Sequence, residues 1–362
     1  MLLLIQYTLI FSSVLVLVAL GGCVSEHSGV INLGLEGIMV IGALGGALMM
    51  RYLGTSSAFV MVLLVMLAAI LFGMIYSSLL GVACINFKAD QTLVGTALNL
   101  LGTAAATVFV KAINTAANPD DHSSEIEYVR ARKMFIVNIN GFEFNWFMLV
   151  AVLAVIFVAV MLYKTKFGLR LMACGEHPQA AASVGVSVYK MRWAGVLISG
   201  ALGGLGGICY ILAGVSIWKF ENGVAGFGFL ALAVMIFGQW KPQRIALAAL
   251  LFGLFRALSN TYVGFPALAA LNLPGNVYNM MPYIVSLIVL AFTSKTSRAP
   301  KAEGIPYDKG TRLFSILSFV YTSKEPPIFG GSFEVYMQKR GLRINGCLYR
   351  TGCLRLWARE RF

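Results

Sequence analysis

The chain has 362 residues, of which 59% are hydrophobic and only 12% are charged, and its mean hydropathy is +0.80. A soluble domain needs far more surface charge than this, so the composition excludes a single soluble core and indicates a polytopic membrane protein. The net charge of +13 does not indicate nucleic-acid binding, because the basic residues lie in blocks between apolar runs, as in cytoplasmic loops.

Apolar runs long enough to cross a hydrocarbon core follow one another along the chain. We expect about nine or ten membrane-spanning helices, and hence an all-α fold. The runs lie at 3–21, 29–50, 58–82, 92–113, 144–163, 192–214, 227–240, 244–262 and 277–293. Gly29, Gly34 and Gly37 interrupt the second run, and the seventh is short. Such broken or short segments indicate the central path of a transporter.

The first run ends in Leu-Gly-Gly-Cys at Cys23, which resembles a lipoprotein cleavage site. A secretory signal opens with positive charge, whereas no Lys or Arg precedes Arg51. Further apolar runs follow immediately. We therefore interpret residues 3–21 as the first membrane-spanning helix.

The stretch SEHSGVINLGLEGIMV, residues 25–40, places Glu26, Asn32 and Glu36 in an otherwise apolar region. Polar side chains at membrane depth are costly unless they face protein or a water-filled route. These residues therefore lie either in a loop exposed to water or along a polar path through the protein.

Basic and non-basic connections alternate in the second half of the chain. Residues 164–192 carry five bases and one acid, and 239–244 and 295–312 are also basic, whereas 261–276 carries no charge. By the positive-inside rule, the basic connections and the C-terminus lie in the cytoplasm.

A short helix is expected within the first basic connection. Pro178 suits the first position of a helix, and Gly185 suits the position just beyond its end. A helix of about two turns is not stable alone in water. This segment is either an ordinary connection or a docking ridge that becomes ordered against a partner.

The sequence contains no pattern typical of catalysis or metal binding. It has no His-Glu-x-x-His pair, no Gly-x-Ser-x-Gly turn and no Gly-Lys dipeptide for a phosphate-binding loop. We expect no catalytic residue, no metal and no cofactor. An ion-coupled carrier remains an alternative, with Glu26, Glu36 and Asp90 as its candidate carboxylates.

Several motifs together resemble one family. In chain order they are SEHSGVINLGLEGIMVIGA, ADQTLVGTALNLLG, YKTKFGLRLMACGEHPQAAASVGVSVYKMR, SGALGGLGGI, GFGFLALAVMIFGQWKP and APKAEGIPYDKGTR. Over residues 1–312 the chain resembles the permease subunits of bacterial ABC importers for branched-chain amino acids and simple sugars. NLGLEG and IPYDKGTR are most similar to permeases of nucleoside (basic-membrane-protein-type) importers.

The resemblance implies a transmembrane permease domain over residues 1–312 that forms half of a translocation pathway in the bacterial inner membrane. The implied partners are a separate ABC ATPase subunit, a second permease of the same or a different chain, and an extracytoplasmic substrate-binding lipoprotein. A nucleoside is the implied substrate, with a simple sugar or a branched-chain amino acid as the alternative.

The resemblance also implies roles for individual residues. The cytoplasmic loop 164–191 would carry a coupling helix that fits into a cleft of the ATPase. This helix would lie around Gly175, Glu176, Pro178, Ala181 and Gly185. The translocation pathway would lie near Asn32, Glu36, Asn99 and Phe229. Asn99 could equally satisfy a backbone group at a helix break. Residues 313–362 match nothing in the family and are expected to be a cytoplasmic extension.

Overall fold

The computed structural model describes residues 2–53, 57–127, 135–139, 142–214, 217–261, 277, 280–285, 287 and 299–308. These belong to one compact unit, Met1–Lys309. Eight helices in the described residues are long and apolar enough to cross a membrane, which confirms an all-α membrane fold. The expected run 277–293 lies largely outside the described residues, and the extension 313–362 lies wholly outside them.

The spanning helices follow the apolar runs of the sequence. In chain order the helices are α1 Leu2–His27, α2 Leu35–Tyr52, α3 Ala58–Gly81, α4 Gln91–Ala117, α6 Trp146–Lys164, α7 Lys166–Glu176, α8 Pro178–Ser183, α9 Val188–Gly214, α10 Phe227–Phe237 and α11 Pro242–Thr261. A π-helix, η1 Val82–Asn86, continues α3, and a 3-10 helix, η3 Phe220–Asn222, precedes α10. The second run was predicted to be helical from residue 29, whereas α2 begins only at Leu35.

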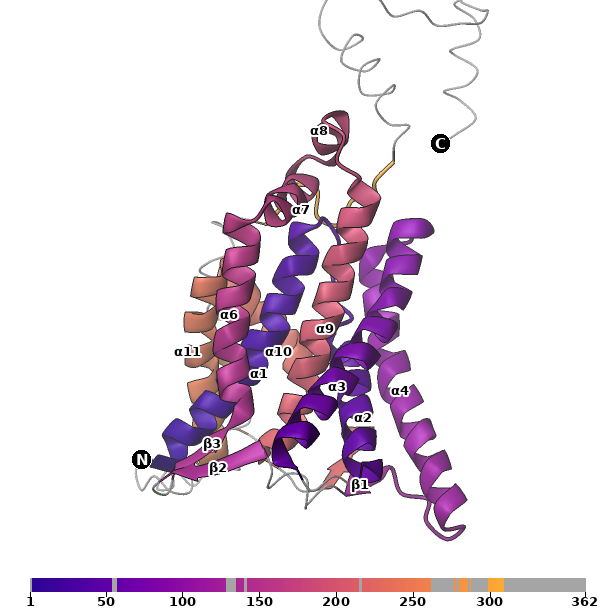
Figure 1. The fold of residues 1–362 in the computed structure, drawn as a ribbon, viewed down its shortest axis with the longest axis vertical. Coiled ribbons are helices and arrows are strands. Elements are labelled where there is room, and N and C mark those ends of the chain that lie inside the picture. Colours follow the sequence, from indigo (N-terminus) through magenta and orange to yellow (C-terminus); the bar gives the residue numbers. More distant parts are fainter. Residues whose placement is uncertain are drawn as a thin grey trace, which may run out of the picture. The chain divides into compact units, whose positions relative to one another are not determined.

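Two small antiparallel ribbons join the helices at one end of the bundle (Figure 1). Strand β1 Glu125–Glu127 pairs with β4 Ile217–Lys219, and β2 Ile136–Ile139 pairs with β3 Phe142–Asn145. We call this the strand end. Helices α7 and α8 lie at the opposite end, which we call the α8 end.

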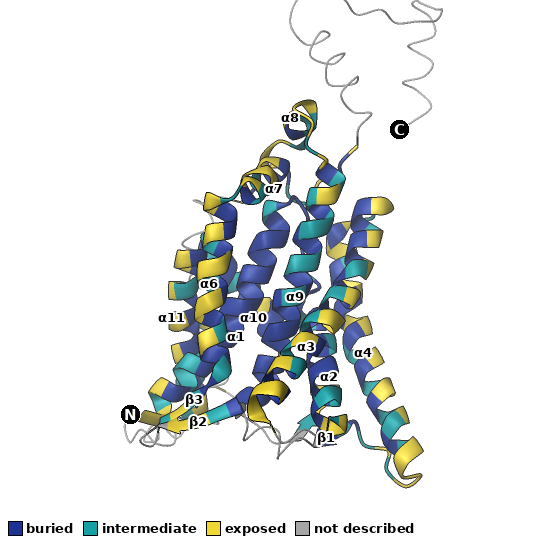
Figure 2. Ribbon diagram, viewed as in Figure 1, coloured by how far each residue is buried: buried dark blue, intermediate teal, exposed yellow. Residues whose placement is uncertain are grey.

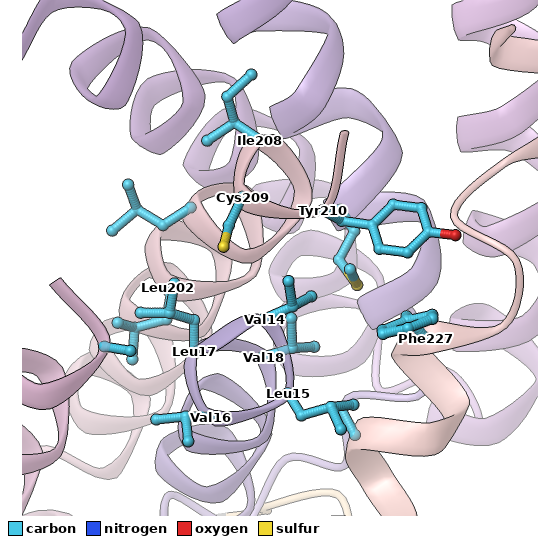
Figure 3. Close-up of a cluster of buried hydrophobic side chains, with 14 of the residues drawn as sticks. Val14, Leu15, Val16, Leu17, Val18, Leu202, Ile208, Cys209, Tyr210 and Phe227 are labelled. Atoms are coloured by element: carbon cyan, nitrogen blue, oxygen red, sulfur yellow. The ribbon is translucent and has the colours of Figure 1, made fainter. Parts of the chain in front are cut away.

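Helices α1 and α9 form the centre of the bundle. In α9, 83% of the most apolar 18-residue window is buried, against 33% in both α3 and α4. The ribbons of α3 and α4 carry many exposed residues (Figure 2), among them large apolar ones. Val14, Leu17 and Val18 of α1 pack beside Leu202 and Cys209 of α9 in the core shown in Figure 3.

Backbones approach closely where α9 crosses α2 and α3. A Cβ atom added to Gly42 would fall against the backbone of Gly204, and one added to Gly73 would fall against the carbonyl oxygen of Gly200. Small residues allow such crossings in membranes, where helices associate by close packing.

Candidate translocation and coupling sites

The connection of residues 28–34 between α1 and α2 is fixed by the side chain of Asn32. Asn32 is fully buried. Its Nδ2 donates to Ser199 Oγ of α9 at 2.8 Å, and its Oδ1 accepts from the backbone N–H of Gly34 at 3.1 Å. Asn32 therefore fastens the 28–34 connection to α9, and Ser199 is a partner that sequence reasoning missed.

Glu36, in the first turn of α2, caps the start of α10. Its Oε1 accepts from the N–H of Gly226 at 2.8 Å, and its Oε2 accepts from the N–H of Gly228 at 2.6 Å. The N-terminus of a helix favours negative charge, because its first N–H groups lack partners within the helix. Gly226 enters the helix with φ +77°, a conformation in which glycine is favoured.

Helix α10 is too short to cross a membrane by itself, and it belongs to the eight candidate spans only together with η3, as Phe220–Phe237. With 11 residues it is about 16 Å long, roughly half the thickness of a hydrocarbon core. It begins at the buried Phe227, beside Glu36 of α2, and ends at Phe237. Just beyond that end, the backbone carbonyl of Trp240 accepts from Cys23 Sγ of α1. The sequence expectation of a short, glycine-flanked segment here is confirmed.

Asn99 of α4 contacts the same region. Its Oδ1 accepts from the N–H of Gly37 at 2.9 Å, and its Nδ2 donates to the carbonyl of Leu33 at 2.8 Å. It satisfies backbone groups on both sides of the helix break, as one of the two sequence interpretations expected. Asn32, Glu36 and Asn99 thus surround the start of α2.

Phe229 differs from these three residues. It is the third residue of α10, and its side chain is 49% exposed on the surface of the single chain. The ring that packs into the core is instead Phe227, whose centroid is 4.5 Å from that of Tyr210 and 5.8 Å from that of Phe11. The guanidinium of Arg256 lies 5.4 Å from the centroid of Phe227, within cation–π distance.

The short helix α8 has the bounds that its sequence signals predict. Pro178 is its first residue, and Gly185, with φ +86°, follows its last turn. Before it, Gly175 is buried, and a Cβ atom there would fall against the carbonyl of His27 at the end of α1. Glu176 is exposed. Helix α7 therefore packs directly on the end of α1.

Ala181 faces the interior of its own chain. It is only 4% exposed and packs with Cys174, Val188 and Tyr307. Its side chain therefore helps to hold α8 against its own chain, and its role at an ATPase interface stays a prediction. The apolar residue presented at the tip is Val184, which is 79% exposed and which sequence reasoning did not single out.

Arg192 also differs from expectation. It was counted among the bases of a loop, but it lies in the second turn of α9 and is 1% exposed. Its Nη2 atom lies close to Gly29, in the 28–34 connection. The exposed bases of this region are Lys164, Lys166, Arg170 and Lys190.

Two carboxyl groups approach each other near the α8 end. Glu26 Oε2 accepts a hydrogen bond from Trp240 Nε1 in the turn between α10 and α11. Glu303, in the described segment 299–308, lies near Glu26. Burial raises the pKa of Glu303 from its usual 4.5 to about 7. In the described part of the chain, no group of three His, Cys, Asp or Glu residues could hold a metal ion.

Comparison with known proteins identifies related transport proteins. The guanosine ABC transporter permease protein NupQ of Bacillus subtilis is 38% identical over 310 residues, which cover 84% of this chain and 96% of NupQ. The nucleoside ABC transporter permease protein NupC of Lactococcus lactis is 38% identical over 306 residues, covering 83% and 95%. A putative glucose ABC transporter permease protein, TsgC13 of Haloferax volcanii, is 33% identical over 258 residues, covering 70% and 76%.

No solved structure matches the chain. The family model described as "branched-chain amino acid transport system / permease component" matches residues 4–292, which include all of the candidate spans described above except the first two residues of α1. The 28–34 connection, the half-length α10 and the α7–α8 pair all lie within this match. The chain therefore belongs to the family of permease components of branched-chain amino acid transport systems.

Proposed function

We propose that this chain is the membrane-spanning permease subunit of an ATP-driven ABC importer for nucleosides, and that it forms half of the translocation pathway. Full-length similarity to NupQ and NupC supports the substrate class. The observation that carries the mechanism is α8, a six-residue helix at one end of the bundle whose tip exposes Val184. The subunit itself hydrolyses no ATP, and a separate ATPase docks on α8.

The α8 end faces the cytoplasm in this proposal. The exposed bases Lys164, Lys166, Arg170 and Lys190 lie there, as the positive-inside rule requires of a cytoplasmic face. The partners are an ATPase at this end, a second permease beside the bundle and a substrate-binding lipoprotein at the strand end. The apolar outer sides of α3 and α4 leave surface for lipid and for the second permease.

The pathway runs beside the junction of α2 and α10. Helices that begin inside the membrane are typical of transporter binding regions, and here Glu36 holds the start of such a helix. Asn32 and Asn99 fix the neighbouring backbone, and the exposed ring of Phe229 lies on α10 itself. In this proposal Asn32, Glu36 and Asn99 hold the backbone that lines the translocation pathway, while the ring of Phe229 faces the pathway itself.

Docking on α8 is tested by Val184→Asp. Because Val184 is exposed in the single chain, the substitution leaves folding intact but places a charge in the proposed interface, where an unpaired charge is costly. The ATPase should no longer co-purify with the variant. The matched control is Val137→Asp at the strand end, also at an exposed valine, which should retain the ATPase. Retention by both variants would contradict docking on α8.

The substrate and the energy source are tested by reconstitution. Proteoliposomes with the ATPase and binding protein should accumulate labelled guanosine, and unlabelled nucleosides should compete. Similarity to TsgC13 favours a sugar as the second candidate, so competition by glucose with none by nucleosides would replace the nucleoside assignment. Accumulation without the ATPase would establish an ion-coupled carrier instead.

A further inference from the structure

The segment of residues 299–308 packs on the proposed coupling helix. The N–H of Ala302 donates to the carbonyl of Gly175, just before α8, at 2.8 Å. Tyr307 is 5% exposed and joins Ala181 and Cys174 in one apolar cluster. Its ring meets that of Tyr189 edge to face at 5.4 Å, and the Tyr189 hydroxyl donates to the Tyr307 carbonyl at 3.4 Å.

The same segment contacts the 28–34 connection on its other side. Gly304 has φ +76°, and a Cβ atom there would lie 2.9 Å from Ile31 Cδ1. A Cβ atom added to Gly29 would lie 3.4 Å from the carbonyl oxygen of Ala302. Since Asn32 belongs to this connection, the 299–308 segment reaches both α8 and the start of the proposed pathway.

The contacts that hold the 299–308 segment in place are mainly made by buried groups. Asp308 forms an ion pair with Lys88 at 3.2 Å, but both side chains are about half exposed, and such pairs contribute little. Tyr307 and the backbone bond to Gly175 are protected from water. A two-turn helix has no stability of its own, so these contacts hold α8 against the bundle.

We propose that the 299–308 segment is a coupling element that links α8 to the 28–34 connection, and that Tyr307 is the residue that positions it. When the ATPase moves α8, Tyr307 and Ala302 carry the displacement to Gly29 and Ile31, beside the direct contact between Gly175 and His27. The inference rests on the proposed docking of an ATPase on α8. It adds a functional role for a segment outside the spanning helices.

Tyr307→Ala tests the proposal in the complete importer. Removing the ring leaves the exposed tip at Val184 unchanged, so the ATPase should still co-purify. Uptake should fall roughly tenfold, the scale of a typical coupling between sites, and ATP hydrolysis should lose its stimulation by substrate-loaded binding protein. Tyr307→Phe keeps the packed ring and the backbone carbonyl and should behave as wild type. Tyr52→Ala removes an exposed tyrosine and should also have no effect.

Gly304→Val is the second variant, because it disturbs the opposite side of the segment and leaves Tyr307 in place. A β-branched residue at positive φ is strained, and its side chain would press on Ile31. Retained ATPase with lost stimulation is again expected. Wild-type stimulation in both Tyr307→Ala and Gly304→Val, with Val184→Asp still releasing the ATPase, would overturn this inference alone. If Val184→Asp retains the ATPase, the docking proposal itself fails.

Discussion

Glu36→Gln removes the negative charge that caps α10 while preserving the size of the side chain. Glu36 accepts two backbone N–H groups, from Gly226 at 2.8 Å and Gly228 at 2.6 Å. A glutamine offers one oxygen and places an NH₂ group, itself a donor, against the other N–H. One charge-assisted bond is lost and the second becomes neutral.

The cost follows from those two bonds. The N–H that loses its acceptor becomes a buried donor without a partner, which costs about 1–3 kcal/mol. The other bond changes from a charged acceptor, which contributes about 1.5–3 kcal/mol, to a neutral one, which contributes about 0.5–1.5 kcal/mol, so it loses about 1 kcal/mol. We therefore expect Glu36→Gln to lower the free energy of unfolding by about 2–4 kcal/mol.

Thermal unfolding of the purified protein in detergent measures this loss as a lower midpoint. Glu176→Gln is the matched control, because Glu176 is exposed, and its midpoint should not change. If Glu36→Gln melts together with the wild type, Glu36 does not hold α10 and the cap is not a source of stability.

Three further predictions concern the α8 end and the orientation of the chain. Because the folded state holds the protonated form of Glu303, with a pKa of about 7 against its usual 4.5, thermal stability should fall as pH rises from about 5 to 8; Glu303→Gln should reduce this slope, and an unchanged slope would rule out Glu303 as its source. Gly175→Ala should destabilise by about 1–3 kcal/mol through overpacking, since its Cβ would meet the backbone of His27; an unchanged midpoint would contradict that close approach. A cysteine at exposed Asn118 should react with an impermeant thiol reagent applied from outside intact cells and one at Gln179 should not, whereas the reverse pattern would invert the proposed orientation.

The spanning helices could be predicted because length and apolarity alone define them. The short helix at Pro178 was predictable for a different reason, since proline and glycine mark its two ends locally. The broken second run was recognised from its glycines, but the start of α2 at Leu35 depends on Asn32 and Asn99 bonding to the backbone. Those bonds join distant segments, so no local pattern indicates them.

The orientation of side chains was less predictable. Ala181 lies within the six-residue α8 and Val184 directly follows it. The packing of Cys174, Val188 and Tyr307 around Ala181, which no local pattern shows, is what buries Ala181. Arg192 looked like a loop base because it closes the basic block 164–192 between two apolar runs, yet it lies in α9 and is buried. The ribbon between β1 and β4 joins residues about ninety positions apart, which periodicity cannot detect.

The glycine crossings of α9 have a mechanical consequence. Where backbone meets backbone, as at Gly42 with Gly204 and at Gly73 with Gly200, one helix cannot slide or roll over another without a steric clash. We therefore expect α2, α3 and α9 to move together as one block during a transport cycle. The start of α10 is held to the same block, because a Cβ atom added to Gly228 would fall against the backbone of Glu36 in α2. We therefore expect any displacement of α10 relative to the block to fall beyond Gly228, toward its end at Phe237.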